Sequence, residues 1–358
     1  AARDYNPMYG LANSAETTAL TWLYFGDAAF VPYPHVLRKP FLHWNATLHF
    51  ALSNYKMPDI IKRIATDRDQ AFVHREFMKK NPMEPKEYCY ISPTYGMASI
   101  VGENGKIVPD VTRWKVQWVT KNKEEEPSVF FLKHPHDTDE WLKWRGASPA
   151  EQVIQYKNVL LAVYKIDEDK KPFIDGPFTP ASFELLKQKD GWFFIHTGSC
   201  LLAVKAVNGL EMTDEKRVTD NHGIVQELGV LKSEGRRNGL IVQTASLDDY
   251  ESGNVEESLN KFISDVLKKT KVNASGINSD NPQLTYRSLS GDLIEIAFDK
   301  FKRVNGKNLD LENWPLLGNP WMHQEIKGHI LVLQHNGKKR VYDFEKWTVE
   351  DSNIYSEK

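Results

Sequence analysis

The residues best suited to chemistry open the chain, in the run Asp4-Tyr5-Asn6-Pro7-Met8-Tyr9-Gly10. An asparagine amide can donate hydrogen bonds to a carboxylate or a carbonyl oxygen, and a tyrosine hydroxyl can move a proton. We therefore expect Asn6 to neutralise an acidic group and Tyr5 or Tyr9 to transfer a proton. A loop whose Tyr and Asn side chains only satisfy backbone groups is the structural alternative.

Three more clusters join titratable side chains to hydrogen-bond donors. They are His74-Arg75-Glu76, Tyr95 within the small-residue run 92–99, and His134-Pro135-His136-Asp137. Each also has a structural interpretation, because cations favour a helix C-terminus, small residues allow close backbone approach, and the histidine run fits a tight turn. The two histidines and Asp137 could also hold a metal, but a tight turn explains them equally well, and we predict neither a metal nor a cofactor.

Aromatic residues beside polar ones suggest that the chain binds a carbohydrate. The sequence has 10 Trp, 14 Tyr and 17 Phe, and sugars are often bound by aromatic faces flanked by hydrogen-bonding groups. Packing in the core of a large sheet explains a tryptophan equally well. We take Trp114 and His134 as candidate substrate-binding residues. The tryptophans that lie beside polar residues are Trp114, Trp118, Trp141, Trp144, Trp314 and Trp321.

The composition argues against several classes of protein. Lys plus Arg number 46 against 48 Asp plus Glu, which gives no electrostatic argument for a nucleic acid or an anionic membrane as partner. No apolar run reaches the roughly 18 residues of a membrane span. The glycine-rich nucleotide motifs and the serine-hydrolase and zinc-protease motifs are also absent. The sequence leaves open whether its two cysteines, Cys89 and Cys200, form a disulfide.

The spacing of apolar residues changes along the chain. Helical spacing predicts helices over 14–25, 36–52 and 58–77. After Glu87, alternation and short apolar runs, bounded by turn signals such as Asp190-Gly191, predict strands, and one further helix is expected over 255–269. The predicted strands cover 87–101, 112–121, 128–133, 153–166, 181–188, 192–207, 222–230, 238–245, 283–288, 293–298, 328–335 and 339–344.

Helices followed by strands indicate an α+β fold. We place the boundary near Pro82, with a helical segment over 1–82 and a large antiparallel β-sandwich over 83–358. Three helices cannot cover all the apolar side chains of the first segment. We expect the β part, an upstream segment or a partner chain to cover the rest. The largest of these side chains are Trp22, Phe25, Phe41, Trp44 and Phe50.

The order of the motifs resembles the heparinase II/III-like group of polysaccharide lyases. The opening run is similar to a Glu-Tyr-Asn-Ser-Pro-x-Tyr stretch near the end of an (α/α) toroid, with Pro7-Met8 where that pattern has Ser-Pro. The segment 58–65, the cluster His74-Arg75-Glu76 and the strand 88–99 follow in the same order. The resemblance implies the end of an (α/α) helical toroid joined to a large antiparallel β-sandwich, with a polysaccharide cleft between them.

The resemblance also implies a reaction, β-elimination at a uronic acid. An Asn or Arg neutralises the carboxylate, a Tyr or His removes the C5 proton, and a Tyr or His protonates the leaving oxygen. Asn6 would neutralise the carboxylate and Tyr9 would act as base or acid. The full set of implied residues comprises Asn6, Tyr9, His74 and Tyr95 as catalytic, and Tyr5, Arg75, His134 and Trp114 as substrate-binding.

Two other functions remain open. A glycoside hydrolase would need two opposed carboxylates, for which Asp4, Glu16 and Glu76 are the candidates. A non-catalytic carbohydrate-binding or assembly subunit would need neither tyrosine nor carboxylate chemistry. The partner we expect is an acidic polysaccharide or oligosaccharide, which implies a secreted or periplasmic protein.

Overall fold

The computed structural model describes residues 56–67, 69–77, 85–102, 112–118, 128–135, 146–178, 183–221, 224–251 and 253–354. Within these ranges the chain is mostly β-sheet. Two α-helices occur there, α3 (Asp59–Thr66) and α4 (Val255–Lys269), with one 3₁₀ turn, η4 (Asp248–Tyr250). Neither α-helix is long and apolar enough to cross a membrane.

The strands form four sheets in which neighbouring strands pair antiparallel, for example β1 with β2 and β7 with β14. The ten-stranded sheet has the order β24 (Thr348–Asn353), β23 (Lys338–Asp343), β22 (Ile330–His335), β21 (Met322–Glu325), β20 (Pro315–Gly318), β1 (Phe72–Phe77), β2 (Lys86–Ile91), β3 (Tyr95–Ile100), β4 (Trp114–Trp118), β5 (Ser128–Phe130). The six-stranded sheet has the order β6 (Glu151–Tyr156), β7 (Val159–Lys165), β14 (Arg237–Ser246), β11 (Cys200–Ala206), β10 (Trp192–His196), β9 (Leu185–Lys189).

Two smaller sheets complete the described part of the chain. The three-stranded sheet has the order β12 (Glu211–Asn221), β13 (Ile224–Glu234), β8 (Phe173–Phe178). The five-stranded sheet has the order β15 (Lys271–Asn273), β16 (Gln283–Arg287), β17 (Leu293–Ala297), β18 (Phe301–Val304), β19 (Lys307–Asn308).

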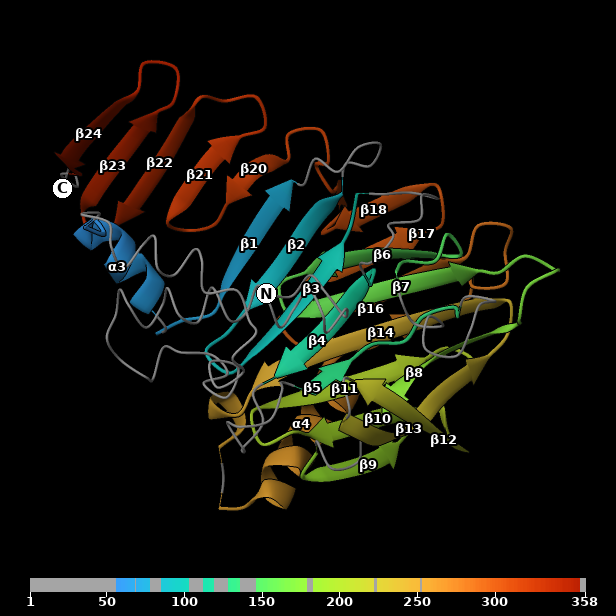
Figure 1. Ribbon diagram of the computed structural model, residues 1–358. Coiled ribbons are helices and arrows are strands. Elements are labelled where there is room, and N and C mark those ends of the chain that lie inside the picture. Colours follow the sequence, from blue (N-terminus) through green and yellow to red (C-terminus); the bar gives the residue numbers. More distant parts are fainter. Residues whose placement is uncertain are drawn as a thin grey trace.

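The main core lies between the ten-stranded and six-stranded sheets, which cross face to face (Figure 1). Because side chains alternate along a strand, each sheet contributes every second residue to this layer. Met97 and Val116 from one sheet and Leu202 and Val242 from the other are completely buried there. The predicted antiparallel β-sandwich is confirmed in this coarse sense.

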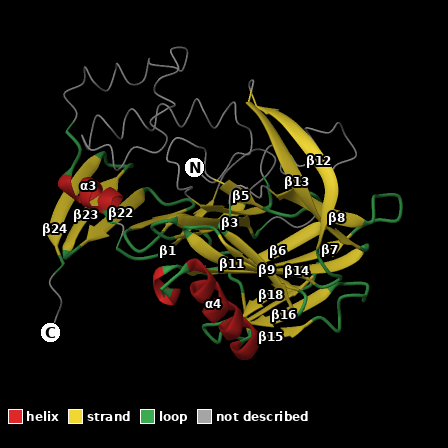
Figure 2. Cartoon of the chain, turned by 90° about the horizontal axis from the view of Figure 1, so that it is seen from below, coloured by secondary structure: helices red, strands yellow, loops and turns green. Residues whose placement is uncertain are grey.

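A second apolar layer covers the other face of the six-stranded sheet. Helix α4 and the five-stranded sheet pack there, as Figure 2 shows below the central strands. Leu259, Phe262 and Ile263 recur at helical spacing and are buried on one face of α4. The side chain of Asn254 accepts a hydrogen bond from the backbone N–H of Glu257 and so caps the helix. The helix predicted over 255–269 is confirmed.

The predicted end of an (α/α) toroid is wrong for the part of the chain that the structure describes. The helix expected over 58–77 ends at Thr66, and the chain continues as strand β1, Phe72–Phe77. Strand β1 pairs with both β2 and β20, and its apolar residues Val73 and Phe77 lie among polar neighbours. These strand contacts outweigh the local helical pattern of the sequence. The helices predicted over 14–25 and 36–52 lie outside the described residues.

The boundary near residue 82 also lies outside the described residues, so it stays a prediction. Strand β1 precedes it and strand β2 follows it, and these two strands are neighbours in one sheet.

Candidate functional site

A row of tyrosines lies on one face of the ten-stranded sheet. Tyr88 and Tyr90 are two residues apart on β2, so they share a face, and Arg75 of β1 stands directly opposite Tyr88. Tyr95 begins β3, and Met97 of that strand stands opposite Tyr90, so Tyr95 lies on this face too. The sheet register therefore aligns these four side chains, from three consecutive strands, on one face.

Tyr90 and Tyr95 form a pair with unequal surroundings. Their ring centroids lie 6.1 Å apart, with 43° between the ring planes. Burial raises the pKa of Tyr95 far above its ordinary range, since this residue is only 5% exposed. Burial also raises the pKa of half-buried Tyr90, but the hydrogen bond from Tyr95 acts in the opposite direction. Tyr90 therefore gives up its proton more readily, and Tyr95 acts as a donor.

Lys157 brings a positive charge to this row from the turn between β6 and β7. Its backbone N–H donates to the hydroxyl of Tyr88 at 2.9 Å, and its ammonium lies 4.9 Å from the ring centroid of Tyr156. Its charge lowers the pKa of Tyr90. The backbone of Lys157 is in the left-handed region, with φ of 50°, which is uncommon for a residue with a side chain.

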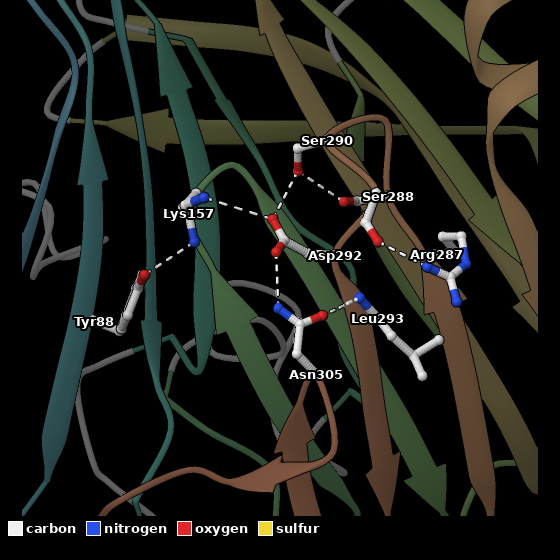
Figure 3. Close-up of polar contacts among 9 residues, drawn as sticks. Tyr88, Lys157, Arg287, Ser288, Ser290, Asp292, Leu293 and Asn305 are labelled. Carbon is white, nitrogen blue, oxygen red and sulfur yellow. Dashed lines mark hydrogen bonds and ion pairs between the residues drawn. The ribbon is translucent and has the colours of Figure 1, made fainter.

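A hydrogen-bonded carboxylate holds the Lys157 side chain (Figure 3). Asp292 lies 3.5 Å from the ammonium and accepts hydrogen bonds from the hydroxyl of Ser290 at 2.8 Å and the amide of Asn305 at 2.9 Å. Burial raises the pKa of Asp292, but these donors and the lysine outweigh it, so the net pKa lies below its usual range. Asp292 therefore stays ionised beside the Lys157 ammonium.

Arg75 supplies a second cation on the same sheet face. Its side chain is exposed, and its guanidinium carbon lies 5.6 Å from the ring centroid of Trp314. Burial raises the pKa of Tyr88 to about 12, although the backbone of Lys157 and the charge of Arg75 both act to lower it. The tyrosine row is thus flanked by two accessible positive charges, and both are held by contacts within the protein.

This arrangement can bind an anion and transfer a proton beside it. A carboxylate placed between Arg75 and Lys157 would be neutralised, and Tyr90 would stand next to it with Tyr95 behind. Within the described ranges, no group of three or more His, Cys, Asp or Glu side chains could hold a metal ion. Phenol, ammonium and guanidinium groups such as these can take part in acid–base and electrostatic chemistry.

The other predicted site residues are not gathered here. Tyr5, Asn6 and Tyr9 lie outside the described residues. His74 points to the face opposite Arg75, since the two are neighbours on one strand. One of its ring nitrogens lies 3.4 Å from the Glu76 carboxylate and the other lies 3.3 Å from the Asn319 amide.

Trp114 and His134 are both buried. Trp114 is 1% exposed within the main core. One ring nitrogen of His134 lies 3.1 Å from the carbonyl oxygen of Lys171, and the other lies 3.4 Å from the hydroxyl of Ser148. Their proposed role in substrate binding stays a prediction.

Four residues of this site were missed by sequence reasoning: Tyr88, Tyr90, Lys157 and Asp292. The alternation Tyr88-Cys89-Tyr90 before a turn was a usable signal, because it places both phenols on one face. Nothing local to Lys157 or Asp292 indicates that they meet. A comparison of the chain with protein-family models and with curated proteins finds no match.

Proposed function

We propose that this protein cleaves an acidic, uronic-acid-containing polysaccharide by β-elimination at the tyrosine row. The observation that carries the proposal is the pair Tyr90 and Tyr95, whose ring centroids lie 6.1 Å apart on the sheet face that Arg75 shares. Elimination needs a proton acceptor next to a neutralised carboxylate, and these residues supply both. The resemblance of the sequence motifs to polysaccharide lyases supports the same reaction class.

The proposed reaction breaks the C5–H and C4–O bonds and moves two protons, one from C5 to Tyr90 and one from a tyrosine hydroxyl to the leaving oxygen. Lys157 and Arg75 bind the uronate carboxylate, which stabilises the negative charge that develops as the C5 proton leaves. Tyr90 in its ionised, phenolate form takes that proton and becomes a phenol, and the electron pair of the C5–H bond forms the C4–C5 double bond as the C4–O bond breaks. The leaving oxygen takes a proton from a tyrosine hydroxyl, for which Tyr95 is the described candidate. No water is consumed.

The test uses the full chain and a panel of alginate, polygalacturonate, hyaluronan and heparin. An unsaturated uronate absorbs in the ultraviolet, so a rise in absorbance on one of these polymers supports elimination. Tyr90→Phe should abolish the rise, whereas Tyr250→Phe should not, because the Tyr250 hydroxyl lies 3.3 Å from Asp265 of α4 instead. Full activity in Tyr90→Phe would remove the assignment.

A non-catalytic carbohydrate-binding subunit is the second candidate function. It is favoured by the burial of Tyr95, which is 5% exposed and so reaches substrate only through Tyr90 or after local movement. Binding of an acidic polymer that depends on Arg75 and Lys157, without any unsaturated product or new reducing ends, would support this candidate. New reducing ends without the absorbance would indicate a hydrolase. A polysaccharide substrate implies a secreted or periplasmic location.

A further inference from the structure

A loop at the far edge of the ten-stranded sheet exposes large aromatic side chains. Strands β23 and β24 are joined by residues 344–347, at the upper left of Figure 1. Trp347 is 86% exposed and Phe344 is 44% exposed, whereas the five other described tryptophans are at most 7% exposed. Exposing an indole to water is unfavourable by roughly 25 cal/mol per Å² of apolar surface, so this placement needs a reason.

Hydrogen bonds within the loop fix the backbone of the turn that precedes Trp347. Asp343 accepts hydrogen bonds from the backbone N–H groups of Glu345 and Lys346, both at 3.0 Å, and its carboxylate lies 3.2 Å from the Lys346 ammonium. Trp347 follows with φ of 57°, a left-handed conformation that is rare for a bulky residue. Strain of this kind persists where surrounding contacts fix it, and it is found most often at functional sites.

Phe344 is supported by a second aromatic ring. Its centroid lies 6.3 Å from that of Tyr342, with the two planes 12° apart. Arg340 lies over Tyr342, with 5.3 Å between its guanidinium carbon and the ring centroid, and pairs with Asp351 at 3.4 Å. Lys346 is likewise paired within the loop, so these cations are already partnered and the exposed aromatic rings dominate the surface.

We propose that Tyr342, Phe344 and Trp347 form a polysaccharide-binding platform, on which the Trp347 indole stacks against the C–H face of a pyranose ring. This inference rests on the polysaccharide part of the proposed function and not on elimination. The platform is six strands from β2, about 29 Å at roughly 4.8 Å per strand. A polymer long enough to reach both places would bind with higher avidity than a short oligosaccharide.

A second copy of the chain is a poorer occupant for this edge. Strand β24 is the outermost strand of the sheet, and its centre carries Glu350 and Asp351. Antiparallel pairing of two such strands about this centre would place Glu350 opposite Asp351 of the other copy, and like charges directly opposite are destabilising.

The experiment is affinity electrophoresis of the full chain in gels containing alginate, polygalacturonate, hyaluronan or heparin. Trp347→Ala should weaken binding to the retarding polymer about tenfold, and Phe344→Ala should weaken it less. The matched control is Met212→Ala, which truncates another exposed apolar side chain, 53% exposed and on a different sheet. Formation of unsaturated product from a short oligosaccharide should be unchanged in Trp347→Ala.

The outcomes separate the two proposals. Retardation that depends on Trp347, with no unsaturated product from any polymer, supports the platform and removes the elimination chemistry. Equal retardation of wild type and Trp347→Ala, or no retardation of wild type at all, overturns the platform. Self-association measured by light scattering that is lost in Trp347→Ala, with polymer binding unchanged, also overturns it and assigns the loop to contact between copies.

Discussion

The rings of Tyr90 and Tyr95 face each other across the turn between β2 and β3, with 6.1 Å between their centroids and 43° between their planes. The two hydroxyls have different environments, since Tyr95 is buried and Tyr90 is half-buried beside Lys157. When two groups of the same kind have different pKa values, one can act as the acid and the other as the base.

Removing the hydroxyl of Tyr95 should make Tyr90 a weaker acid. The hydrogen bond from Tyr95 lowers the pKa of Tyr90, so Tyr95→Phe should raise that pKa and move the pH–rate profile of elimination to higher pH. At neutral pH the rate should fall about tenfold or more. The control is Tyr164→Phe, which also removes a buried phenol hydrogen bond, to the carbonyl of Leu132 at 3.1 Å, but leaves Tyr90 untouched. An unshifted profile in Tyr95→Phe would refute the pairing.

Replacing Lys157 should weaken substrate binding without unfolding the protein. Its side chain is 47% exposed and its ion pair with Asp292 is loose, so Lys157→Met should change the free energy of unfolding by less than about 1 kcal/mol. Loss of a charged hydrogen bond to the substrate carboxylate should raise KM about tenfold. Lys300→Met, at an exposed turn, is the control for charge alone. Equal KM values in the two variants would exclude Lys157 from binding.

The contact between Asp67 and His335 should fix α3 to the C-terminal strands. The Asp67 carboxylate lies 2.9 Å from the His335 ring, and both side chains are largely buried, at 18% and 6% exposure. Asp67→Asn should therefore reduce the local stability of α3 and β22 by about 1–3 kcal/mol. Hydrogen exchange of backbone amides in these two elements measures the effect. Asp69→Asn, an exposed change two residues away, should leave their exchange rates as they are.

Lys302 should make stability depend on pH above neutrality. Burial, with a smaller contribution from the charge of Arg113, lowers its pKa from 10.5 to about 7. The unfolded chain therefore binds more protons than the folded one between these values, so stability rises with pH across this window. Lys302→Met lacks this rise, although it also loses the 2.6 Å hydrogen bond to the carbonyl of Val101.

Urea unfolding at several pH values between 7 and 10.5 checks this prediction. Relative to Lys302→Met, the wild type should be least stable near pH 7 and gain steadily as the pH rises. A difference that does not vary with pH would show that Lys302 titrates normally. Lys307→Met, an exposed change on β19, serves as the comparison.

Features of the fold that depend on neighbours in sequence could be predicted. The helix 255–269 follows from apolar spacing and an asparagine cap, and both are local. The turns Asp190-Gly191 and Asn336-Gly337 also follow from local chemistry. All four of these residues have positive φ, which such dipeptides adopt readily.

Other boundaries were obscured because burial removes the alternating pattern. The range 153–166 was predicted as one strand, but it is the hairpin β6–β7 with Lys157 and Asn158 at the turn. Five of the six residues of β6 and six of the seven of β7 are buried, so apolar residues occur without a period of two. The turn has no glycine to mark it.

The sequence by itself determined that the chain is rich in β-strands, where helix α4 lies, and which tyrosines and cationic side chains are present. Only the tertiary structure decided that Tyr90, Lys157 and Asp292 meet, because sheet register and the packing of distant hairpins are set by contacts between residues far apart in the chain. The same distant pairing, of β1 with β20, turned a segment with helical spacing into a strand and placed Arg75 and His74 on opposite faces of the sheet.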